Sequence, residues 1–254
     1  MVNYRGFQTL FHRETLRFLT LPNQTLLPSI VSTGLYIIIF GFFLGSRVSQ
    51  IEGFDYILFI FPGLLMMGVV LSAFQNAATS LFISRWERFI EDLLVAPISF
   101  TQMVMAYVLA STTRGVINGL LVLICGLVLL PIPFEHPFLL LVTLILTSIV
   151  FSASGLIVGL WADRWDNIAV VLNYVITPLM FLGGVFYATS TLPEKFRWVN
   201  ELNPIFYMVS GVRYSFLGKA DVAYSTCILV TLVLAVGFCL WALYLFKKGY
   251  KLRS

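Results

Sequence analysis

The chain has 254 residues, of which 59% are hydrophobic and only 11% are charged. Together with a mean hydropathy of +0.93, this composition excludes an ordinary soluble domain and indicates an integral membrane protein. The formal net charge of +4 suits a membrane protein that faces an anionic lipid leaflet, and it gives no reason to expect nucleic acid as a partner.

Residues 1–22 combine aromatic and basic side chains at helical spacing. The aromatic residues are Tyr4, Phe7, Phe11 and Phe18, with three arginines and a histidine among them. This pattern predicts an amphipathic helix that lies in the membrane interface. A basic flank that only sets the topology is an equally open interpretation. The start of the chain is charged and mixed, so we expect no cleavable signal sequence.

Six apolar runs are each long enough to cross a membrane as a helix, which takes about 20 residues. They cover residues 26–46, 56–80, 101–130, 138–161, 168–188 and 222–246. The sequence lacks the alternating ten-residue segments that a transmembrane β-barrel needs, and it contains no internal repeat or linker. We therefore predict an all-α polytopic membrane protein with six transmembrane helices, folded as a single domain over residues 1–254.

A charged segment, residues 84–97, lies between the second and third runs. Ser84 and Glu87 have the three-residue spacing of a capping box, which predicts that a short helix begins there. The residue before Pro97 resists helical geometry, so the helix is expected to end at that proline. One face of this helix is apolar and consists of Trp86, Phe89, Ile90, Leu93 and Leu94. The other face is charged and consists of Arg85, Glu87, Arg88, Glu91 and Asp92.

On the charged face, Arg88 is expected to pair with the acidic residues one turn away, Glu91 and Asp92. The segment is either a solvated surface helix between two spans or a docking element for another protein. The sequence of the segment alone leaves both interpretations open.

In the fourth run, small residues recur at intervals of three or four. They are Ser148, Ser152, Gly155 and Gly159. Small residues spaced in this way allow two membrane helices to approach closely. We therefore expect them to serve packing and not to form a site.

The stretch from residue 189 to residue 221 is apolar but is interrupted by Pro193, Pro204 and Arg213. Its longest apolar part is too short to span a membrane. Counting it as a span would also place the basic C-terminus outside. We therefore predict a re-entrant helical hairpin in the outer leaflet, with Gly183 and Gly184 allowing the chain to turn into it.

Basic residues are unevenly divided between the two sides that this topology defines. Ten lie on the side that holds both termini: Arg5, Arg13, Arg17, Arg85, Arg88, Arg164, Lys247, Lys248, Lys251 and Arg253. Five lie on the other side: Arg47, Lys195, Arg197, Arg213 and Lys219. Lys and Arg accumulate on the cytoplasmic side of membrane proteins, so we expect both termini in the cytoplasm.

The interiors of the predicted spans contain no Asp, Glu or His. Proton-coupled transporters and intramembrane proteases generally need such residues at membrane depth, so both classes lose support. A Gly-x-x-x-x-Gly-Lys-Ser/Thr loop is also absent, and energy would have to come from another chain. Cys125, Cys227 and Cys239 lie in apolar runs without ligand-like spacing and are expected to be core residues. The sequence thus predicts no catalytic residue, no metal site and no bound cofactor.

Arg114 is the exception, because it lies midway along the third run. An arginine at that depth costs about 2.5–3.5 kcal/mol unless it finds partners. It is a helix–helix clamp, a contact for an anionic substrate, or a residue facing an aqueous cavity. Its candidate partners are backbone carbonyls, Asn118, Asn173, Tyr174 or an anionic group of a lipid or substrate. The residues that could line a substrate path are Gln75, Asn76, Arg114, Asn173, Tyr174 and Thr177.

Three segments carry a resemblance to a known family. They are Glu87-Arg-Phe-Ile-Glu-Asp-Leu-Leu-Val-Ala-Pro-Ile-Ser99, Leu182-Gly-Gly-Val-Phe-Tyr187, and Leu202-Asn-Pro-Ile-Phe-Tyr-Met-Val-Ser-Gly-Val-Arg213 with the following Phe216-Leu-Gly218. With these segments, essentially the whole chain resembles the membrane subunit of ABC transporters of the type-two permease superfamily, close to its bacterial YadH-like group.

The resemblance implies two permeases and two ABC ATPase subunits that together export a lipid, glycolipid, polysaccharide or hydrophobic compound across the bacterial inner membrane. ATP and Mg would then bind to the partner ATPase and not to this chain, which would be no enzyme by itself. The resemblance makes residues 84–97 the coupling helix that contacts the ATPase, through Arg85, Trp86, Glu87, Arg88, Phe89, Glu91, Asp92, Leu93 and Pro97. A secondary multidrug or lipid transporter without an ATPase, and a membrane scaffold, remain the alternatives.

Overall fold

The computed structural model describes residues 4–44 and 50–252, and within them almost all regular structure is helical. The chain begins with α1 (Tyr4–Leu19), α2 (Pro22–Thr25), α3 (Leu27–Ile37) and the π-helical η1 (Ile38–Leu44). Next come the two-residue strands β1 (Gln50–Ile51) and β2 (Phe54–Asp55), and then α4 (Tyr56–Trp86), α5 (Phe89–Val95), α6 (Phe100–Leu129) and α7 (Pro137–Trp161). The last part contains α8 (Trp165–Val171), η2 (Leu172–Ile176), α9 (Thr177–Leu182), η3 (Thr189–Thr191), η4 (Glu194–Phe196), α10 (Arg197–Leu202), α11 (Pro204–Leu217) and α12 (Tyr224–Lys248).

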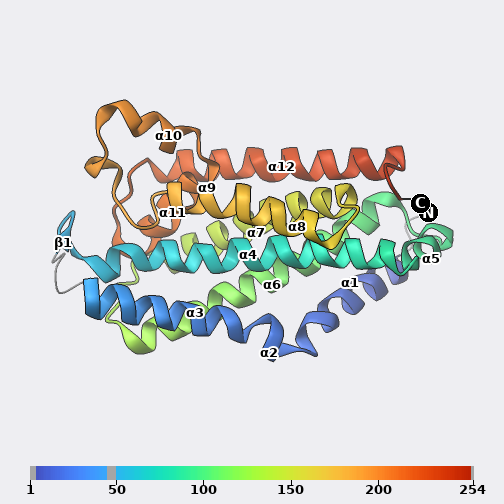
Figure 1. The fold of residues 1–254 in the computed structure, drawn as a ribbon, viewed down its shortest axis with the longest axis horizontal. Helices are drawn as coiled ribbons and strands as arrows, with labels where there is room; N and C mark the ends of the chain where they lie inside the picture. Colours follow the sequence, from blue (N-terminus) through green and yellow to red (C-terminus); the bar gives the residue numbers. More distant parts are fainter. Residues whose placement is uncertain (1–3, 45–49, 253–254) are drawn as a thin grey trace.

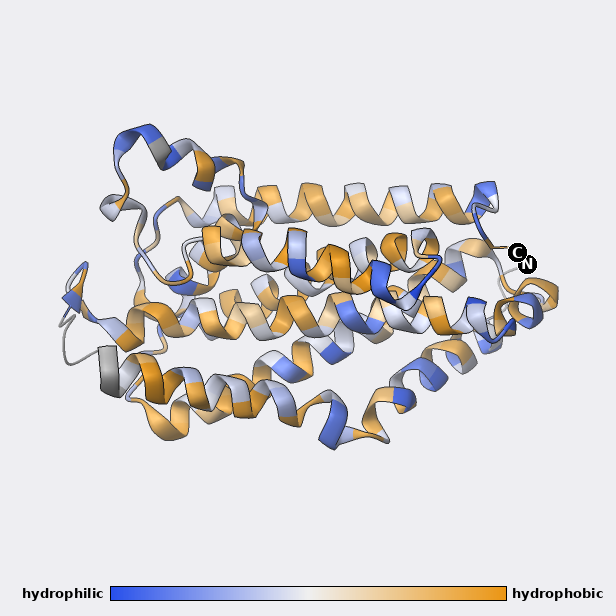
Figure 2. Cartoon of the chain, viewed as in Figure 1, coloured by the Kyte–Doolittle hydropathy of each residue, from blue (hydrophilic) through white to orange (hydrophobic). Residues whose placement is uncertain are grey.

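The long helices lie side by side along the longest axis of the molecule (Figure 1). Apolar residues predominate along them, and hydrophilic residues gather on α1, around α5 and in the segment around α10 (Figure 2). Five helical segments are long and apolar enough to cross a membrane: α4, α6, α7, residues 165–182 and α12. The prediction of a polytopic all-helical membrane protein is confirmed in this respect, with one small β-hairpin as the exception.

The first predicted span is only partly described. Its helix is continuous from Leu27 to Leu44 as α3 and η1, and residues 45 and 46 lie outside the described residues. The apolar helix found there, Leu27–Gly41, is shorter than the five other spans. A sixth span therefore stays a prediction.

The hairpin between η1 and α4 was not predicted. β1 and β2 are antiparallel, with Gln50 opposite Asp55. Glu52 and Gly53 have φ of 53° and 87°, which is the left-handed pair that a tight two-residue hairpin requires. Ser190 donates a hydrogen bond of 2.7 Å to the Glu52 carboxylate, which attaches the hairpin to the segment before α10.

The centre of the molecule is α7, which packs against α4, α6, α11 and α12. The predicted close approach of small residues is confirmed here. A Cβ on Gly155 would lie 2.4 Å from the carbonyl oxygen of Phe74, and one on Gly159 would lie 2.6 Å from that of Ala78. The backbones of α4 and α7 are therefore nearly in contact, which only glycine at these two positions allows.

The predicted boundary between the second span and the charged segment is wrong. Ser84 does not cap a new helix, because α4 continues through it to Trp86, and its buried side chain accepts a hydrogen bond of 3.1 Å from Tyr107. The break comes at Arg88, whose φ of 59° is left-handed, and α5 begins only at Phe89. A capping box does occur nearby, at Ser99 and Gln102, where it starts α6.

The start of α1, the short helix α5 and the end of α12 all lie at one end of the bundle (Figure 1). The β-hairpin and α10 lie at the opposite end. The helix predicted for residues 1–22 is present as α1, which packs against α6, and its buried residues are Leu10, Glu14 and Phe18. These three residues follow one another at intervals of four, so they share one face of the helix.

Candidate functional site: the α5 end and an arginine-lined groove

Two of the five residues of the predicted apolar face are buried inside the protein. Ile90 and Leu93 are 3% and 7% exposed and belong to a core cluster shared with α4, α6 and the C-terminal segment. The ring of Phe89 lies under the guanidinium group of Arg13, 3.5 Å away, so α1 covers it. Trp86, by contrast, is 74% exposed and Val95 is 87% exposed.

The polar residues of this end form an exposed surface around Trp86. Glu87, Arg88, Glu91, Asp92 and Pro97 are all exposed. The ion pairs of the described residues do not include the predicted pairing of Arg88 with Glu91 or Asp92. Arg88 is left-handed and precedes α5 instead of belonging to it, which removes it from the one-turn geometry that the prediction assumed.

Arg85 points away from the charged surface. Its Nη1 donates to the carbonyl oxygens of Gly159 at 3.0 Å, Leu160 at 2.8 Å and Ala162 at 3.0 Å. These carbonyls lie at the C-terminus of α7, where helical acceptors have no partner within the helix. Arg85 thus joins the end of α4 to the end of α7, and the prediction that it lies on the exposed charged face is wrong.

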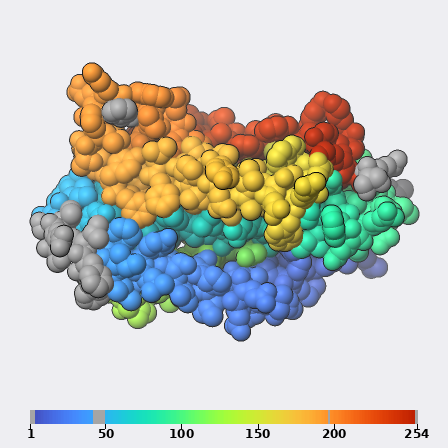
Figure 3. Space-filling model, in the orientation of Figure 1, coloured from blue at the N-terminus to red at the C-terminus, as the bar shows by residue number. Residues whose placement is uncertain are grey.

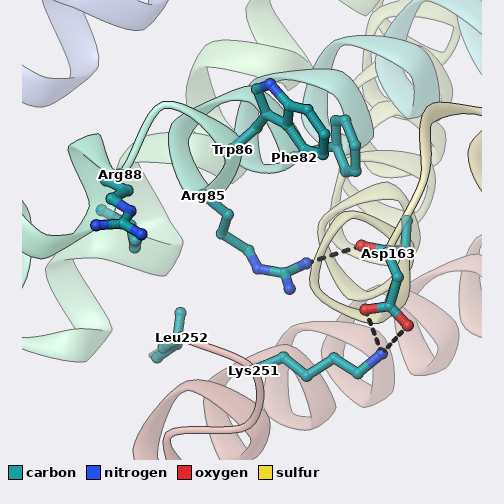
Figure 4. Close-up of a pocket in the computed structure, with 9 residues that line it drawn as sticks. Phe82, Arg85, Trp86, Arg88, Asp163, Lys251 and Leu252 are labelled. Atoms are coloured by element: carbon teal, nitrogen blue, oxygen red, sulfur yellow. Dashed lines mark hydrogen bonds and ion pairs between the residues drawn. The ribbon is translucent and has the colours of Figure 1, made fainter. Parts of the chain in front are cut away.

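A cavity of 380 Å³ lies beside Arg85, between α4, α5, the α7–α8 connection and the C-terminal residues. Figure 4 shows Lys251 reaching across it to Asp163, at 2.7 Å to each carboxylate oxygen. The hydrogen bond from Lys251 lowers the pKa of Asp163 below its ordinary value. On the α4 side, the indole of Trp86 stacks on Phe82 with 6.0 Å between ring centroids.

The second site is a groove between α1–α3 and the pair α4 and α8. Figure 3 shows this hollow, with atoms of α6 visible inside it. It consists of a cavity of 480 Å³ and an adjoining cavity of 260 Å³. Both cavities are lined by Gln24, Thr25, Gln75 and Arg114.

Asn76 brings two arginines together in this groove. Its Oδ1 accepts from Arg17 Nη2 at 3.2 Å and from Arg114 Nη1 at 3.1 Å, and its amide nitrogen donates to Ser111 Oγ at 2.9 Å. Arg114 also donates to the carbonyl of Thr25 at 3.3 Å. Of the partners predicted for Arg114, a backbone carbonyl is confirmed, while Asn118 instead donates to the carbonyl of Gly68.

Three of the six predicted substrate-path residues lie together in the groove, namely Gln75, Asn76 and Arg114. The other three do not line it. Asn173 and Tyr174 are exposed on the outer surface of η2, and the hydroxyl of Thr177 donates to the Leu172 carbonyl of its own helix.

Glu14, which was not predicted as a site residue, is 1% exposed and lies beside Arg17. It accepts a very short hydrogen bond from Ser80, and its carboxylate lies 3.5 Å from Arg17 and 3.9 Å from Arg13. Its burial could have been predicted from the sequence, because Glu14 is the only acidic residue among the first fifty and lies on the same helical face as Leu10 and Phe18.

At the opposite end, the two other quoted segments form one hydrogen-bonded cluster. Gly184 has a φ of 72° and turns the chain as predicted, and its carbonyl accepts from Arg213 Nη2 at 2.6 Å. Arg213 also forms a buried ion pair with Asp221, at 2.5 Å. Asn203 caps α11 through the backbone of Ile205 and donates to a carbonyl of α9 at 2.7 Å.

Comparison with known proteins agrees with this arrangement. A family model described as ABC-2 type transporter matches residues 5–217. The chain is 40% identical over 249 residues to the inner membrane transport permease YadH of Escherichia coli K12, and this alignment covers 98% of this chain and 97% of the relative. It is 25% identical over 174 residues to nodulation protein J of Bradyrhizobium diazoefficiens, covering 68% of this chain and 66% of the relative. With nodulation protein J of Rhizobium meliloti it shares 21% identity over 211 residues, or 83% and 80% of the two chains. Since the family model spans most of the chain and the first of these alignments spans nearly all of it, the protein belongs to the ABC-2 type transporter family as a membrane transport permease.

Proposed function

We propose that this permease is the membrane subunit of an ATP-driven exporter. Membership of the family implies partnership with an ABC ATPase, and in this proposal two permeases associate with two ATPase subunits. ATP and Mg bind to the ATPase, and this chain binds no cofactor. The cargo is a lipid, glycolipid, polysaccharide or hydrophobic compound that leaves the cytoplasm or the inner leaflet.

The proposed topology has six spans, with α3 and η1 contributing the first. Both termini and α5 face the cytoplasm, and residues 189–221 form the hairpin in the outer leaflet. The grouping of α1, α5 and the end of α12 at one end of the bundle supports this topology. So does the excess of basic residues in the segments that lie at that end.

The proposal that α5 couples the ATPase to the membrane helices rests on one observation, the exposed surface around Trp86 between two long helices. An exposed tryptophan rimmed by charged residues is typical of the centre of a protein interface. Because α4 and α6 flank α5 directly, a displacement of α5 by the ATPase moves both helices. The exposed surface of Trp86, Glu87, Arg88, Glu91, Asp92 and Pro97 is the proposed contact, with Phe89 and Leu93 supporting it from inside.

The test is association with the partner ATPase and substrate-stimulated ATP hydrolysis. Trp86→Ala is expected to weaken association at least about tenfold, because truncating a central interface tryptophan typically costs about 2 kcal/mol or more. Glu87→Ala and Glu91→Ala should have smaller, salt-dependent effects, since charges at the rim of an interface mainly steer association.

Trp198→Ala is the matched control, because Trp198 is also exposed, at 58%, but lies in α10 at the opposite end. It should associate like the wild type. Wild-type association and coupled hydrolysis in Trp86→Ala would remove the coupling role from this surface.

A further inference from the structure

The groove brings two positive charges close together. Arg17 and Arg114 come from helices far apart in the sequence, and both donate to the same oxygen of Asn76. Their guanidinium groups are therefore within two hydrogen-bond lengths of one another. Two like charges so close in a low-dielectric environment repel strongly unless an anion lies nearby.

The acidic residue near these two arginines is Glu14, and it already has several partners. Its carboxylate pairs with Arg13 and Arg17 and accepts a hydrogen bond from Ser80. Arg114 has no acidic partner in the part of the chain that the structure describes, and its Nε is buried there without an acceptor. The cluster of Arg13, Glu14, Arg17 and Arg114 therefore retains a net positive charge.

The space beside these charges is amphipathic. Next to Arg17 and Arg114, the 480 Å³ cavity is lined by amide and hydroxyl groups, which come from Gln24, Thr25, Gln75, Asn76 and Thr79. Its remaining wall is apolar and includes Phe18, Leu21, Ile168 and Leu172. A ligand that fits this lining carries an anionic group at one end and hydrocarbon at the other.

We propose that the groove binds the phosphate-bearing head group of an anionic lipid, with Arg17 and Arg114 as its recognition pair. Guanidinium groups suit this task, because each can offer two parallel N–H donors to phosphate oxygens. The bound phosphate places a negative charge between two cations that otherwise repel. The inference deepens the proposed function, on which its transport role rests, by specifying an anionic lipid as the class of substrate.

Binding is tested with the permease alone, in detergent, against phosphatidylglycerol and phosphatidylcholine, for example by native mass spectrometry. The wild type is expected to prefer phosphatidylglycerol at least about tenfold. Arg17→Gln and Arg114→Gln should each reduce this preference about tenfold, because each variant loses the charge that strengthens its hydrogen bonds to a phosphate oxygen. Lys248→Gln removes an exposed charge at the end of α12 and should keep the preference.

Equal binding of the two lipids by the wild type would overturn the proposal, as would an unchanged preference in Arg114→Gln. Glycerol 3-phosphate separates a lipid from a free phosphate compound. It should compete poorly, since it lacks the acyl chains that the apolar wall would contact. Competition as strong as that of phosphatidylglycerol would overturn the assignment to a lipid.

A third measurement does not depend on whether the arginine variants fold. A photoreactive residue at Gln75, which lines both cavities, should crosslink phosphatidylglycerol in preference to phosphatidylcholine. The same residue at Leu229, which is 60% exposed on α12, should crosslink both lipids alike. Equal crosslinking at Gln75 would contradict the site. These lipid-binding measurements use the permease without the ATPase, so they are independent of ATPase association. A permease that prefers phosphatidylglycerol but does not associate with the ATPase would contradict only the exporter function. A permease that associates with the ATPase but has no lipid preference would contradict only this site.

Discussion

Three arginines in the described residues each bind at least one backbone carbonyl. Arg85 donates to three carbonyls at the end of α7, Arg114 to Thr25 and Asn76, and Arg213 to Gly184. A chain with 11% charged residues has few acids to offer, and buried charges need hydrogen bonds in compensation. Each of these arginines consequently links two helices or a helix and a turn.

The ion pair between Arg213 and Asp221 is the most buried in the described structure, with the two side chains 3% and 5% exposed. Arg213→Leu leaves the Asp221 carboxylate buried without its partner. We expect the free energy of unfolding to fall by roughly 3–5 kcal/mol, measured by thermal or denaturant unfolding in detergent.

Removing both charges should cost much less than removing one, because a buried pair can often be replaced by apolar residues at little loss. The double variant Arg213→Leu, Asp221→Leu should therefore recover part of the stability. Lys195→Leu, at an exposed position, should have almost no effect. If the double variant is no more stable than Arg213→Leu, the pairing does not account for the loss.

The contact between Asp163 and Lys251 should give a pH-dependent contribution to stability. The pKa of Asp163 in the folded protein is lowered by the hydrogen bond from Lys251, relative to about 3.9 in an unfolded chain. A lowered pKa means that the stabilisation is fully present above pH 4 to 5 and is lost as the pH falls through the folded-state pKa. The melting temperature of the wild type should exceed that of Asp163→Asn at pH 7, and the difference should vanish in acid.

A constant difference across that range would show that Asp163 acts through shape and not through charge. Asp166→Asn is the control, because Asp166 is also exposed, in the first turn of α8 three residues further on, and has no ion pair in the described residues.

At the scale of the elements, the α4–α7 contact depends on the absence of side chains at two positions. Gly155→Leu would place its Cβ against the Phe74 carbonyl, 2.4 Å away. Overpacking of this kind typically costs about 1–3 kcal/mol, so we expect a lower unfolding temperature and a reduced yield of folded permease. Gly237→Leu is the control, because nothing lies within 4 Å of a Cβ at that position on α12. Equal loss in the two variants would show that close approach is not the cause.

The helices could be predicted where apolar runs are long, because length alone identifies a span. Five such runs appear as helices in the structure. The start of α5 could not be predicted, since it depends on the left-handed backbone of Arg88, a conformation that arginine rarely adopts. The apolar spacing continues unbroken from α4 through Trp86, and so the sequence gives no sign of the break.

The groove was predictable only in part. Gln75, Asn76 and Arg114 were identified as polar residues at membrane depth, and they do lie together. Arg17 and Thr25 were missed as their partners, because that contact depends on where the segment before α3 folds back. Asn173 and Tyr174 were misplaced because a span that is apolar all round has no periodicity to show which face is inward.

For the whole molecule, the proposed topology is tested by cysteine labelling of intact cells. With the three native cysteines replaced, a cysteine at Lys195 should react with a membrane-impermeant reagent, and one at Lys248 should react only after permeabilisation. Both positions are exposed, so a lack of reaction would not reflect burial in the protein. Labelling of Lys248 but not of Lys195 in intact cells would reverse the topology.

The hydrogen bonds of Arg85 determine which helices can move together. Because α4 and α7 are joined at their ends by Arg85 and along their length by Gly155 and Gly159, we expect them to move as one body. Lys251, three residues after α12, donates to the carbonyl of Trp161 at the end of α7 and to Asp163 in the α7–α8 connection. The other walls of the groove come from α1–α3 and from α8, which this linkage does not include. A push on α5 would then change the width of the groove more than it changes the bundle itself.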